Sequence, residues 1–547
     1  MNQINCKAQK FIALVVCLVL VITNLNAQEL ANEVYSHSNY DWEEIPVLYE
    51  LNEEELKASA VIVKDNRIVE YAYGNDDGLY LFETAHKIVR VNDDQGVEGF
   101  NKVVVPMSNV LDFVVLKARA ISPDGKITVL DRDKIKELEN VGDWGALKIF
   151  AIEGLEKGGE VEYLYTTKGQ VREPYGREFM QSETKMKEAG FTLISPSNLI
   201  FEAKAYNGFP ELILTEENDS RILNGVAVNL PALLEEDYSN YRANLARVAY
   251  KLRKNDASKN GKDLYTWELA AETFSELIYS YSNDDAKKIK KIIKKEKLNK
   301  GSVDQKVRKI DTYIKNNYTL EEGSGAEFTS VGSIVKNKYA NEVGMSRMMA
   351  AMLDVSEINH NMVVTSNRFQ TRFDSEFEDW GNFTDIIFYI PDTKKYLAAT
   401  MIEHRYGEAP YHFANNYGLF VNKAKKTAEV AFIEMPNAEY STNRIDANVT
   451  FNENFQPILD MEYGWTGYRA AMFRAFYKYQ EGFIDERMKS GMTDADLGDV
   501  AVFNESMEDT AFPNKEFYAK GRLSNVNSLI EKAGKNYLFK IGDIIGD

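Results

Sequence analysis

The stretch that decides the fold of the central region is KNKYANEVGMSRMMAAMLDVSEINHNMVVTSNRF (residues 336–369), followed after a polar segment by DWGNFTDIIFYIPDTKKYLAAT (residues 379–400). In its first half, apolar residues recur at helical spacing: Met345, Met348, Met349, Met352 and Leu353. This spacing predicts a helix over 342–354 with a buried face. Short apolar runs follow at 362–365, 383–390 and 395–399, and a Pro-Asp turn separates the last two. The stretch therefore predicts a buried helix packed against a sheet.

This order of a small-residue turn, a buried helix and strands resembles the core of the transglutaminase-like (papain-related) superfamily. In that superfamily a Cys begins the helix, a His opens a following strand and an Asp lies on the strand after it. The resemblance implies a thiol nucleophile that the His activates and the Asp orients. When the helix is aligned by its apolar residues, Glu342 stands at the Cys position, Phe383 at the His position and Ala398 at the Asp position. The alignment predicts that the catalytic triad is lost.

The cysteine content supports the same prediction. Cys6 and Cys17 are the only cysteines of the sequence, and both lie in its N-terminal leader. No thiol chemistry is available after the leader, so we expect a cleft that binds without cleaving. Its candidate ligand-binding residues are Glu342, Met345, Ser346, Asn382 and Phe383.

Two arrangements without a thiol remain open. Glu342 and Ser346 lie one helical turn apart, and Ser346 with His360 would make a nucleophile and a base. Glu342 with Asp385 would make the carboxylate pair of a glycoside hydrolase. Neither pattern is specific, because no carboxylate is evident to orient His360 and acidic residues are common throughout the chain.

Metal and cofactor motifs are absent from the sequence. The five histidines (His37, His86, His360, His404 and His412) include no pair at i,i+3 or i,i+4, and no Walker loop, dinucleotide fingerprint or G-x-S-x-G elbow occurs. We therefore expect no metal and no cofactor. His404 and His412 flank a loop with Glu403 and Glu408, which we interpret as solvated loop residues.

Residues 1–27 have the pattern of a secretory signal. Lys7 and Lys10 precede an apolar run from Phe11 to Ile22, and small residues lead to a cleavage site at Ala27–Gln28. No later segment is long enough to cross a membrane, so a periplasmic or secreted protein is expected. Without the two leader lysines, 63 basic residues face 84 acidic ones, a formal charge of −21. This charge argues against nucleic acid as a partner. The oligomeric state is not indicated.

The regions on either side of the central stretch are rich in β-like runs. ARAISPDGKITVL (residues 118–130) and IEGLEKGGEVEYLY (residues 152–165) are similar to the domain of unknown function 3857 that begins transglutaminase-like proteins of Gram-negative bacteria. Strands are expected at 60–63, 68–73 and 191–206, among others, and helices at 267–281 and 303–318. The lysine-rich segment 284–300 is interpreted as a solvated helix rather than a docking face. Beyond 410, a hairpin (445–451 and 458–463), a helix with an aromatic stripe (Trp465, Tyr468, Met472, Phe476) and further strands are expected.

Together these patterns predict an α+β protein with a signal peptide (1–27), an N-terminal β-sandwich-like domain (28–230), a helical connection with a transglutaminase-like α/β core (231–410) and a shortened C-terminal β domain (411–547). The expected function is non-catalytic binding or assembly, with a peptide, a protein or a glycan as ligand. An enzyme of the same superfamily with relocated, non-thiol groups is the alternative.

Overall fold

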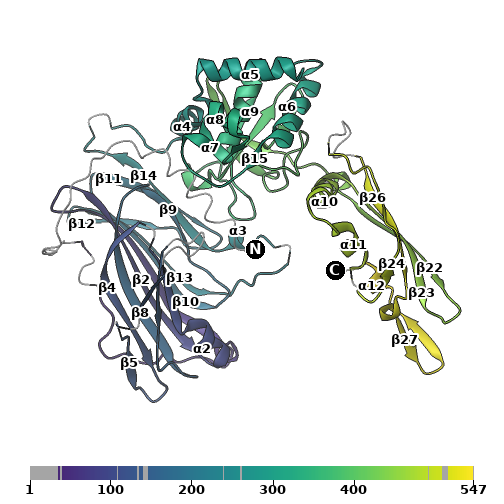
Figure 1. Cartoon of the computed structure of the whole chain (residues 1–547). Helices are drawn as coiled ribbons and strands as arrows, with labels where there is room; N and C mark the ends of the chain where they lie inside the picture. The colour runs from purple at the N-terminus through teal and green to yellow at the C-terminus, as the bar shows by residue number, and fades with distance from the viewer. Residues whose placement is uncertain are drawn as a thin grey trace. The chain divides into compact units, whose positions relative to one another are not determined.

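The computed structural model describes residues 35–36, 40–107, 109–131, 133, 135–138, 146–237, 239–258, 261–490, 492–507 and 515–545. The predicted signal peptide, its two cysteines and His37 lie outside these residues. The chain is a mixture of α and β structure and divides into two compact units (Figure 1). The first unit comprises the chain up to Ala270 together with Ser366–Thr384, and the second comprises Ala271–Thr365 and Asp385–Asp547.

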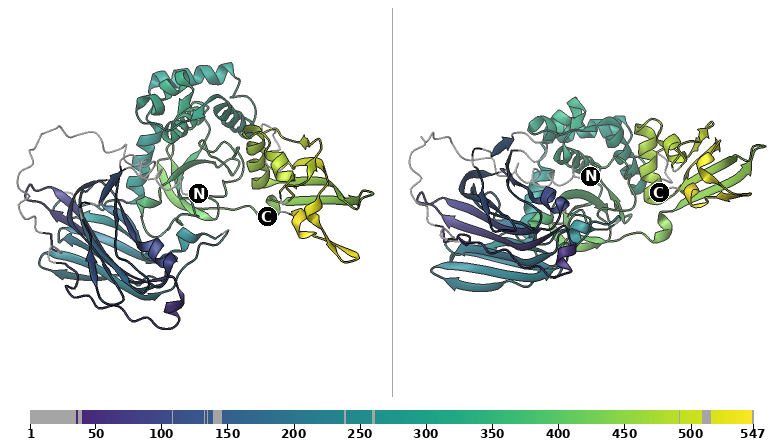
Figure 2. Two further views of the ribbon diagram at one scale, coloured as in Figure 1. Left: turned by 60° about the horizontal axis from the view of Figure 1, so that its bottom comes forward. Right: turned by 90° about the horizontal axis from the view of Figure 1, so that it is seen from below.

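The first unit is built on an eight-stranded sheet of order β12-β13-β10-β1-β2-β8-β4-β5, seen as the purple to blue strands of Figures 1 and 2. Its strands are β1 (Ala60–Tyr73), β2 (Leu79–Val91), β4 (Val110–Ile121), β5 (Ile127–Val129), β8 (Glu160–Gln170), β10 (Met186–Pro196), β12 (Ile213–Glu217) and β13 (Ser220–Leu230). The central strand β1 pairs parallel with β10 and antiparallel with β2. The short helix α2 (Asp94–Phe100) follows β2, capped by Asp93.

Two smaller sheets complete this unit. One has the order β11-β14-β9, formed by Leu199–Tyr206, Arg247–Asn255 and Tyr175–Phe179. The other has the order β3-β7-β6, formed by Lys102–Pro106, Leu147–Ala151 and Lys136–Leu138. Aromatic contacts join the first of these sheets to the large one, because Tyr71 stacks on Phe201 with ring centroids 4.5 Å apart and Phe191 on Tyr250 at 5.8 Å. Buried aromatic pairs of this kind add packing energy beyond their area.

Two of the expected strand boundaries in this region are wrong. The runs 60–63 and 68–73 are one strand, β1, with a bulge between Ile62 and Lys64. The polar residues between them, which suggested a break, are accommodated because Asp65 pairs with Arg67 and Lys87. Conversely, the run 191–206 spans two strands, β10 and β11, which lie in different sheets.

Helices α5 to α9 gather in the second unit in Figure 1, and α4, which passes from the first unit into the second after Ala270, precedes them in the chain. They are α4 (Trp267–Tyr279), α5 (Asn283–Lys295), α6 (Val303–Asn317), α7 (Ala326–Thr329), α8 (Val331–Asn337) and α9 (Glu342–Val355). The predicted helix 342–354 is confirmed as α9, which Asn341 caps by accepting a hydrogen bond from Gly344 N at 2.9 Å. The lysine-rich segment is a helix, α5, with Ile289 and Ile293 buried and its lysines exposed. Its interpretation as a solvated face rather than a docking face stays a prediction.

The second unit also contains a five-stranded antiparallel sheet of order β19-β18-β17-β20-β21. Its strands are β17 (Asn361–Thr365), β18 (Asp385–Ile390), β19 (Lys395–Leu397), β20 (Asn416–Asn422) and β21 (Thr427–Ile433). The strand expected from Phe383 begins two residues later, at Asp385, because Trp380–Asn382 forms a 3-10 turn capped by Asp379. One face of the sheet packs Val363, Ile387 and Phe420 against the loop that carries Ala409 and Phe413.

The C-terminal part of the second unit is a further antiparallel sheet with the helices α10 (Gly467–Tyr479) and α11 (Phe483–Met488). Its strands are β22 (Asn443–Phe451), β23 (Pro457–Trp465), β24 (Asp496–Leu497), β25 (Ala501–Phe503) and β26 (Phe517–Ser524). The hairpin β27 (Ile530–Ala533) and β28 (Asn536–Phe539) and the short helix α12 (Gly542–Ile545) follow.

The expected aromatic stripe of this helix is wrong. Trp465 is the last residue of β23 and is fully buried, whereas Phe476 on α10 is exposed. The helix begins only at Gly467, so its buried side is set by Ala470, Phe473 and Arg474 instead. Among the described residues, no helix has the length and apolar character needed to cross a membrane.

Candidate functional site

The N-terminal end of α9 carries three of the predicted site residues. Glu342 is the first residue of the helix, where a negative charge is favourable to the helix dipole. Met345 and Ser346 are buried inside the second unit, with 3% and 2% of their surface exposed. Their side chains therefore belong to the core around α9 and offer little surface to a ligand.

Phe383 and Asn382 lie in the first unit, on the segment Ser366–Thr384. Phe383 is 1% exposed and is surrounded by aromatic rings: Trp267 at 5.8 Å, Phe373 at 5.9 Å and Trp380 at 6.1 Å between ring centroids. An apolar ring in an aromatic cluster cannot accept or donate the proton that a thiol mechanism needs.

The segment Ser366–Thr384 is held to β11, β14 and β9 by its acidic residues. The Tyr206 hydroxyl donates to Asp374 Oδ2 at 2.8 Å, and Lys251 Nζ lies 2.5 Å from Glu378 Oε2. Arg177 Nη2 donates to Asn382 Oδ1 at 2.7 Å and to Asp379, while its Nη1 donates to the Thr371 hydroxyl at 2.9 Å. Asn382 thus serves as an acceptor in a buried polar cluster that fixes this segment.

Ala398 lies in the second unit, immediately after β19, with 1% of its surface exposed. It packs among Val363, Ile387 and Tyr396. The position where the resemblance places an orienting Asp therefore holds a methyl group in an apolar core. Because Phe383 belongs to one unit and Glu342 and Ala398 to the other, the clustering of the three positions stays a prediction.

His360, the candidate base for Ser346, has partners at both ring nitrogens. Its Nε2 lies 3.1 Å from the Tyr279 hydroxyl, and its Nδ1 lies 2.8 Å from the carbonyl oxygen of Ile358. The Nδ1–H therefore donates to the carbonyl and Nε2 accepts from Tyr279. Burial lowers the pKa of His360, which keeps the ring neutral. These contacts describe a structural histidine, and the pairing of Ser346 with His360 gains no support. The Glu342–Asp385 pair stays a prediction.

The interpretation of His404 as a solvated loop residue is wrong. Only 7% of its surface is exposed, and its ring lies against Tyr411, Tyr468 and His412 with centroids 5.9, 6.0 and 6.5 Å away. Burial, together with His412 and Lys315, lowers the pKa of His404 to about 3. The side chains of the described residues contain no group of three or more His, Cys, Asp and Glu that could hold a metal ion.

The reason for this burial is the path of the loop 401–413. Tyr396 and Gly407 exchange two backbone hydrogen bonds, of 2.7 and 3.0 Å, which fold the loop back on the sheet. Lys315 of α6 donates to the carbonyl oxygen of His404. The Tyr468 hydroxyl of α10 donates to Ala409 O at 2.7 Å. These contacts join residues far apart in sequence, so the loop's composition alone did not reveal them.

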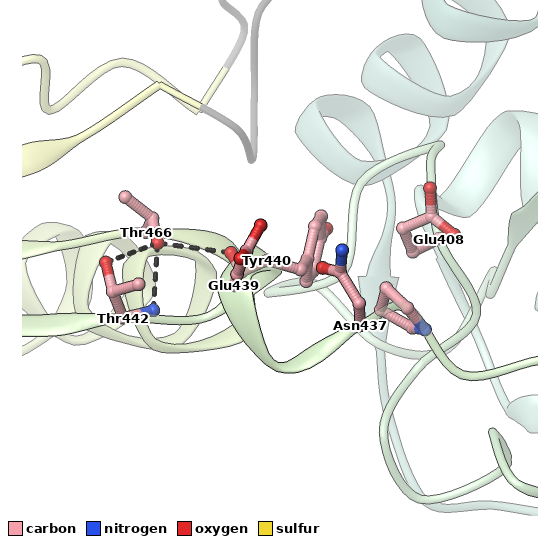
Figure 3. Close-up of a pocket in the computed structure, with 7 residues that line it drawn as sticks. Glu408, Asn437, Glu439, Tyr440, Thr442 and Thr466 are labelled. Carbon is pink, nitrogen blue, oxygen red and sulfur yellow. Dashed lines mark hydrogen bonds between the residues drawn. The ribbon is translucent and has the colours of Figure 1, made fainter.

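An open pocket lies beside this loop in the second unit (Figure 3). It has a volume of about 580 Å³ and is lined by Glu408, Pro436, Asn437, Glu439, Tyr440, Thr442 and Thr466. The Thr466 hydroxyl donates to Tyr440 O at 3.1 Å and accepts from Thr442 N at 2.9 Å, so one wall is fixed by hydrogen bonds. The Tyr440 ring packs edge-on against Tyr468 at 5.1 Å.

The lining of this pocket is polar with one aromatic ring. Glu408 and Glu439 supply carboxylates, Asn437 an amide and the two threonines hydroxyls. Burial raises the pKa of the Tyr440 hydroxyl, so it stays protonated and able to donate. Sequence reasoning noted Glu408 but missed the other residues, because they come from a connecting segment and from the ends of two strands.

Comparisons with known proteins agree with part of this description. No curated protein matches the chain. A crystal structure from Parabacteroides distasonis ATCC 8503, provisionally described as a protease, matches with a TM-score of 0.50 and 12% sequence identity, covering 85% of this chain and 93% of that one. This likeness concerns the fold alone. Residues 82–234 match the family model described as a domain of unknown function, DUF3857. The DUF3857 domain predicted for the N-terminal part is thereby confirmed.

Proposed function

We propose that this protein is a non-catalytic, transglutaminase-like binding protein of the periplasm or the extracellular space. The observation that carries the proposal is the chemistry of the positions that match the triad. No cysteine occurs after residue 17, and the positions matching the His and the Asp hold Phe383 and Ala398, both buried and apolar. A protein with neither thiolate nor base keeps only the binding part of the family's chemistry.

The pocket beside Tyr440 supports the binding proposal better than the predicted cleft residues do. Met345, Ser346, Asn382 and Phe383 are buried, whereas Glu408, Asn437, Glu439 and Thr442 are exposed around an open hollow. Carboxylate, amide and hydroxyl groups around one tyrosine ring suit the hydroxyl groups and the apolar ring face of a sugar. We propose a glycan as the ligand of this pocket.

The proposal can be tested by calorimetric titration of the purified protein with a panel of oligosaccharides. Glu439→Gln and Tyr440→Ala should each weaken binding of the responding oligosaccharide by about tenfold, the effect of losing one good contact. Tyr417→Ala is the matched control, because Tyr417 is an exposed tyrosine on β20 of the same unit. Equal affinity in all four proteins would remove the pocket from the proposal, and binding of peptides in place of oligosaccharides would change the ligand class.

A second experiment tests the predicted clustering of the lost triad. The triple variant Glu342→Cys, Phe383→His and Ala398→Asp should react with iodoacetamide faster than the single variant Glu342→Cys, because a nearby His lowers the pKa of a thiol. Equal rates would show that the three positions do not meet.

The alternative, an enzyme with relocated groups, has one observation in its favour. The protein from Parabacteroides distasonis with a similar fold is provisionally described as a protease. Because a fold hosts many functions, this likeness favours the alternative only weakly. Glu342 and Ser346 would be the residues to test, and activity measurements decide between the two functions.

A further inference from the structure

Arg405, on the loop 401–413 of the second unit, is a buried cation without a partner. Only 5% of its surface is exposed. Its three guanidinium nitrogens are buried, and among the described residues none of the three has a hydrogen-bond partner. A guanidinium carries five N–H donors, and burying them unpaired is strongly unfavourable. The buried guanidinium of Arg405 therefore lacks hydrogen-bond acceptors in the part of the chain that the structure describes.

The other buried arginines show that this is unusual for the chain. Arg474 donates to Asn504 O and Lys515 O, Arg119 donates to Glu162, and Arg247 donates to Ala243 O. Each of these guanidinium groups donates at least one hydrogen bond, whereas no nitrogen of Arg405 has a partner among the described residues.

The charges near Arg405 indicate that its missing hydrogen-bond acceptor is negatively charged. Lys315 on α6 is also buried, and its Nζ lies 2.9 Å from Asp311 Oδ1. Asp311 Oδ2 accepts the backbone N–H of Tyr406 at 3.0 Å, and Oδ1 is the ion-pair partner of Lys315. Lys315 also donates to the carbonyl oxygen of His404, the residue before Arg405, so this second buried cation lies against the same loop. The carboxylate of Asp311 is thus paired with Lys315, and no carboxylate of the described residues is paired with Arg405.

Glu403 does not supply the missing charge in this structure. It lies two residues before Arg405 and is partly exposed. The ion pairs found among the described residues include none between Glu403 and Arg405, and Asp311 of α6 is paired with Lys315.

We propose that Arg405, in the field of Lys315, binds a small inorganic anion inside the loop 401–413. Chloride and phosphate share the required chemistry, since both accept hydrogen bonds from a guanidinium and carry the missing negative charge. The anion would connect the loop to α6 and so hold the wall that carries Glu408. The site is separate from the proposed glycan pocket and does not depend on it.

The test measures the Tm of the purified protein at constant ionic strength. Gluconate, which is bulky, is the starting anion and is replaced stepwise by the small anion. Chloride and phosphate are titrated in separate series. We expect the Tm to rise and to saturate with at least one of them, because an anion bound only to the folded state stabilises it by mass action. Arg405→Met should lose this dependence, and Arg469→Gln, an exposed arginine of the same unit, should keep it.

A crystal of the wild-type protein soaked in bromide gives a readout that does not need a folded variant. An anomalous peak within hydrogen-bond distance of the Arg405 guanidinium is the expected result. The proposal is overturned by a Tm that is the same in gluconate, chloride and phosphate. It is also overturned if density shows ordered water only, or the Glu403 carboxylate, against the guanidinium.

Discussion

The two units of the chain treat buried charge differently. In the first unit, Asp65 lies 2.5 Å from Arg67 and 2.7 Å from Lys87, and Arg177 is bonded to Thr371, Asp379 and Asn382. In the second unit, the loop 401–413 buries Arg405 without a partner and keeps His404 neutral by burial. In these two places the first unit pairs its buried charges with its own side chains, whereas the loop 401–413 leaves the Arg405 guanidinium without an acceptor among the described residues.

The loop 401–413 is therefore the part of the second unit to which the two proposals refer. Buried polar groups normally have hydrogen-bond partners, so a buried guanidinium with no partner calls for an explanation such as a bound ion. The unpaired groups lie on the loop that also carries Glu408, which lines the open pocket. We therefore place the proposed binding site in the second unit.

The largest expected effect is the acid sensitivity of the second unit. The pKa of His404 is lowered to about 3 by burial, against 6.5 in an unfolded chain, so the folded state binds the proton less readily. Its stability is complete above pH 6.5 and decreases as the pH falls from 6.5 toward 3, by at most about 4 to 5 kcal/mol. Urea unfolding at several pH values measures this loss of stability. Hydrogen exchange of peptides from each unit then shows whether the loss belongs to the second unit.

His404→Phe is the variant that separates this effect from general acid unfolding. Phenylalanine keeps an aromatic ring against Tyr411 and Tyr468 but does not titrate. The loss of stability between pH 6.5 and 4 should become smaller in this variant. An unchanged slope would assign the acid sensitivity to other groups.

Arg177→Met should destabilise the first unit by about 3 to 5 kcal/mol, because it leaves Asp379 as a buried charge without its partner. The free energy of unfolding in urea measures this change. The double variant Arg177→Met with Asp379→Leu should recover part of the loss, since removing both charges removes the penalty. Arg253→Met, on an exposed arginine of the same unit, is the control and should change little. A loss no larger than that of the control would show that the segment Ser366–Thr384 is held by other contacts.

A smaller pH dependence of stability is expected from Asp65, where neighbouring charges rather than burial lower the pKa. Burial opposes its ionisation, but the charges of Arg67 and Lys87 outweigh burial and lower its pKa to about 2. The resulting stabilisation, about 2 kcal/mol, is complete above pH 3.8 and is lost as the pH falls toward 2. Asp65→Asn should therefore be less stable than wild type at pH 5 and nearly equal to it near pH 2. Asp112→Asn, an exposed carboxylate on β4, should follow wild type at both values.

Local patterns predicted much of the fold. The methionines of α9 and the alternating runs of β17 and β18 identify their elements, because helix and strand periodicity is contained in the sequence itself. The Pro-Asp-Gly and Gly-Gly turns pointed to the DUF3857 domain, which the comparison confirmed.

The candidate site was much less predictable. Trp465 was wrongly assigned to the helix, because the sequence pattern did not show where the helix begins. The helix begins two residues later, at Gly467, a glycine with positive φ. His404 and the pocket were missed because their surroundings come from α6, α10 and the segment after β21, which sequence spacing does not relate to one another. Long-range contacts of this kind decide burial, and burial decides whether a histidine or an arginine is a solvated residue or part of a site.

The most direct test of the central claim is an activity measurement on the purified protein. Glutamine-containing and lysine-containing peptides are incubated with wild type, Glu342→Ala and Ser346→Ala, and the products of cleavage and transamidation are measured by mass spectrometry. We predict product formation no faster than in the absence of protein for all three, because removing a nucleophile or a base costs many orders of magnitude in rate. Turnover by the wild type that Glu342→Ala or Ser346→Ala abolishes would contradict the account and establish an enzyme with relocated catalytic groups.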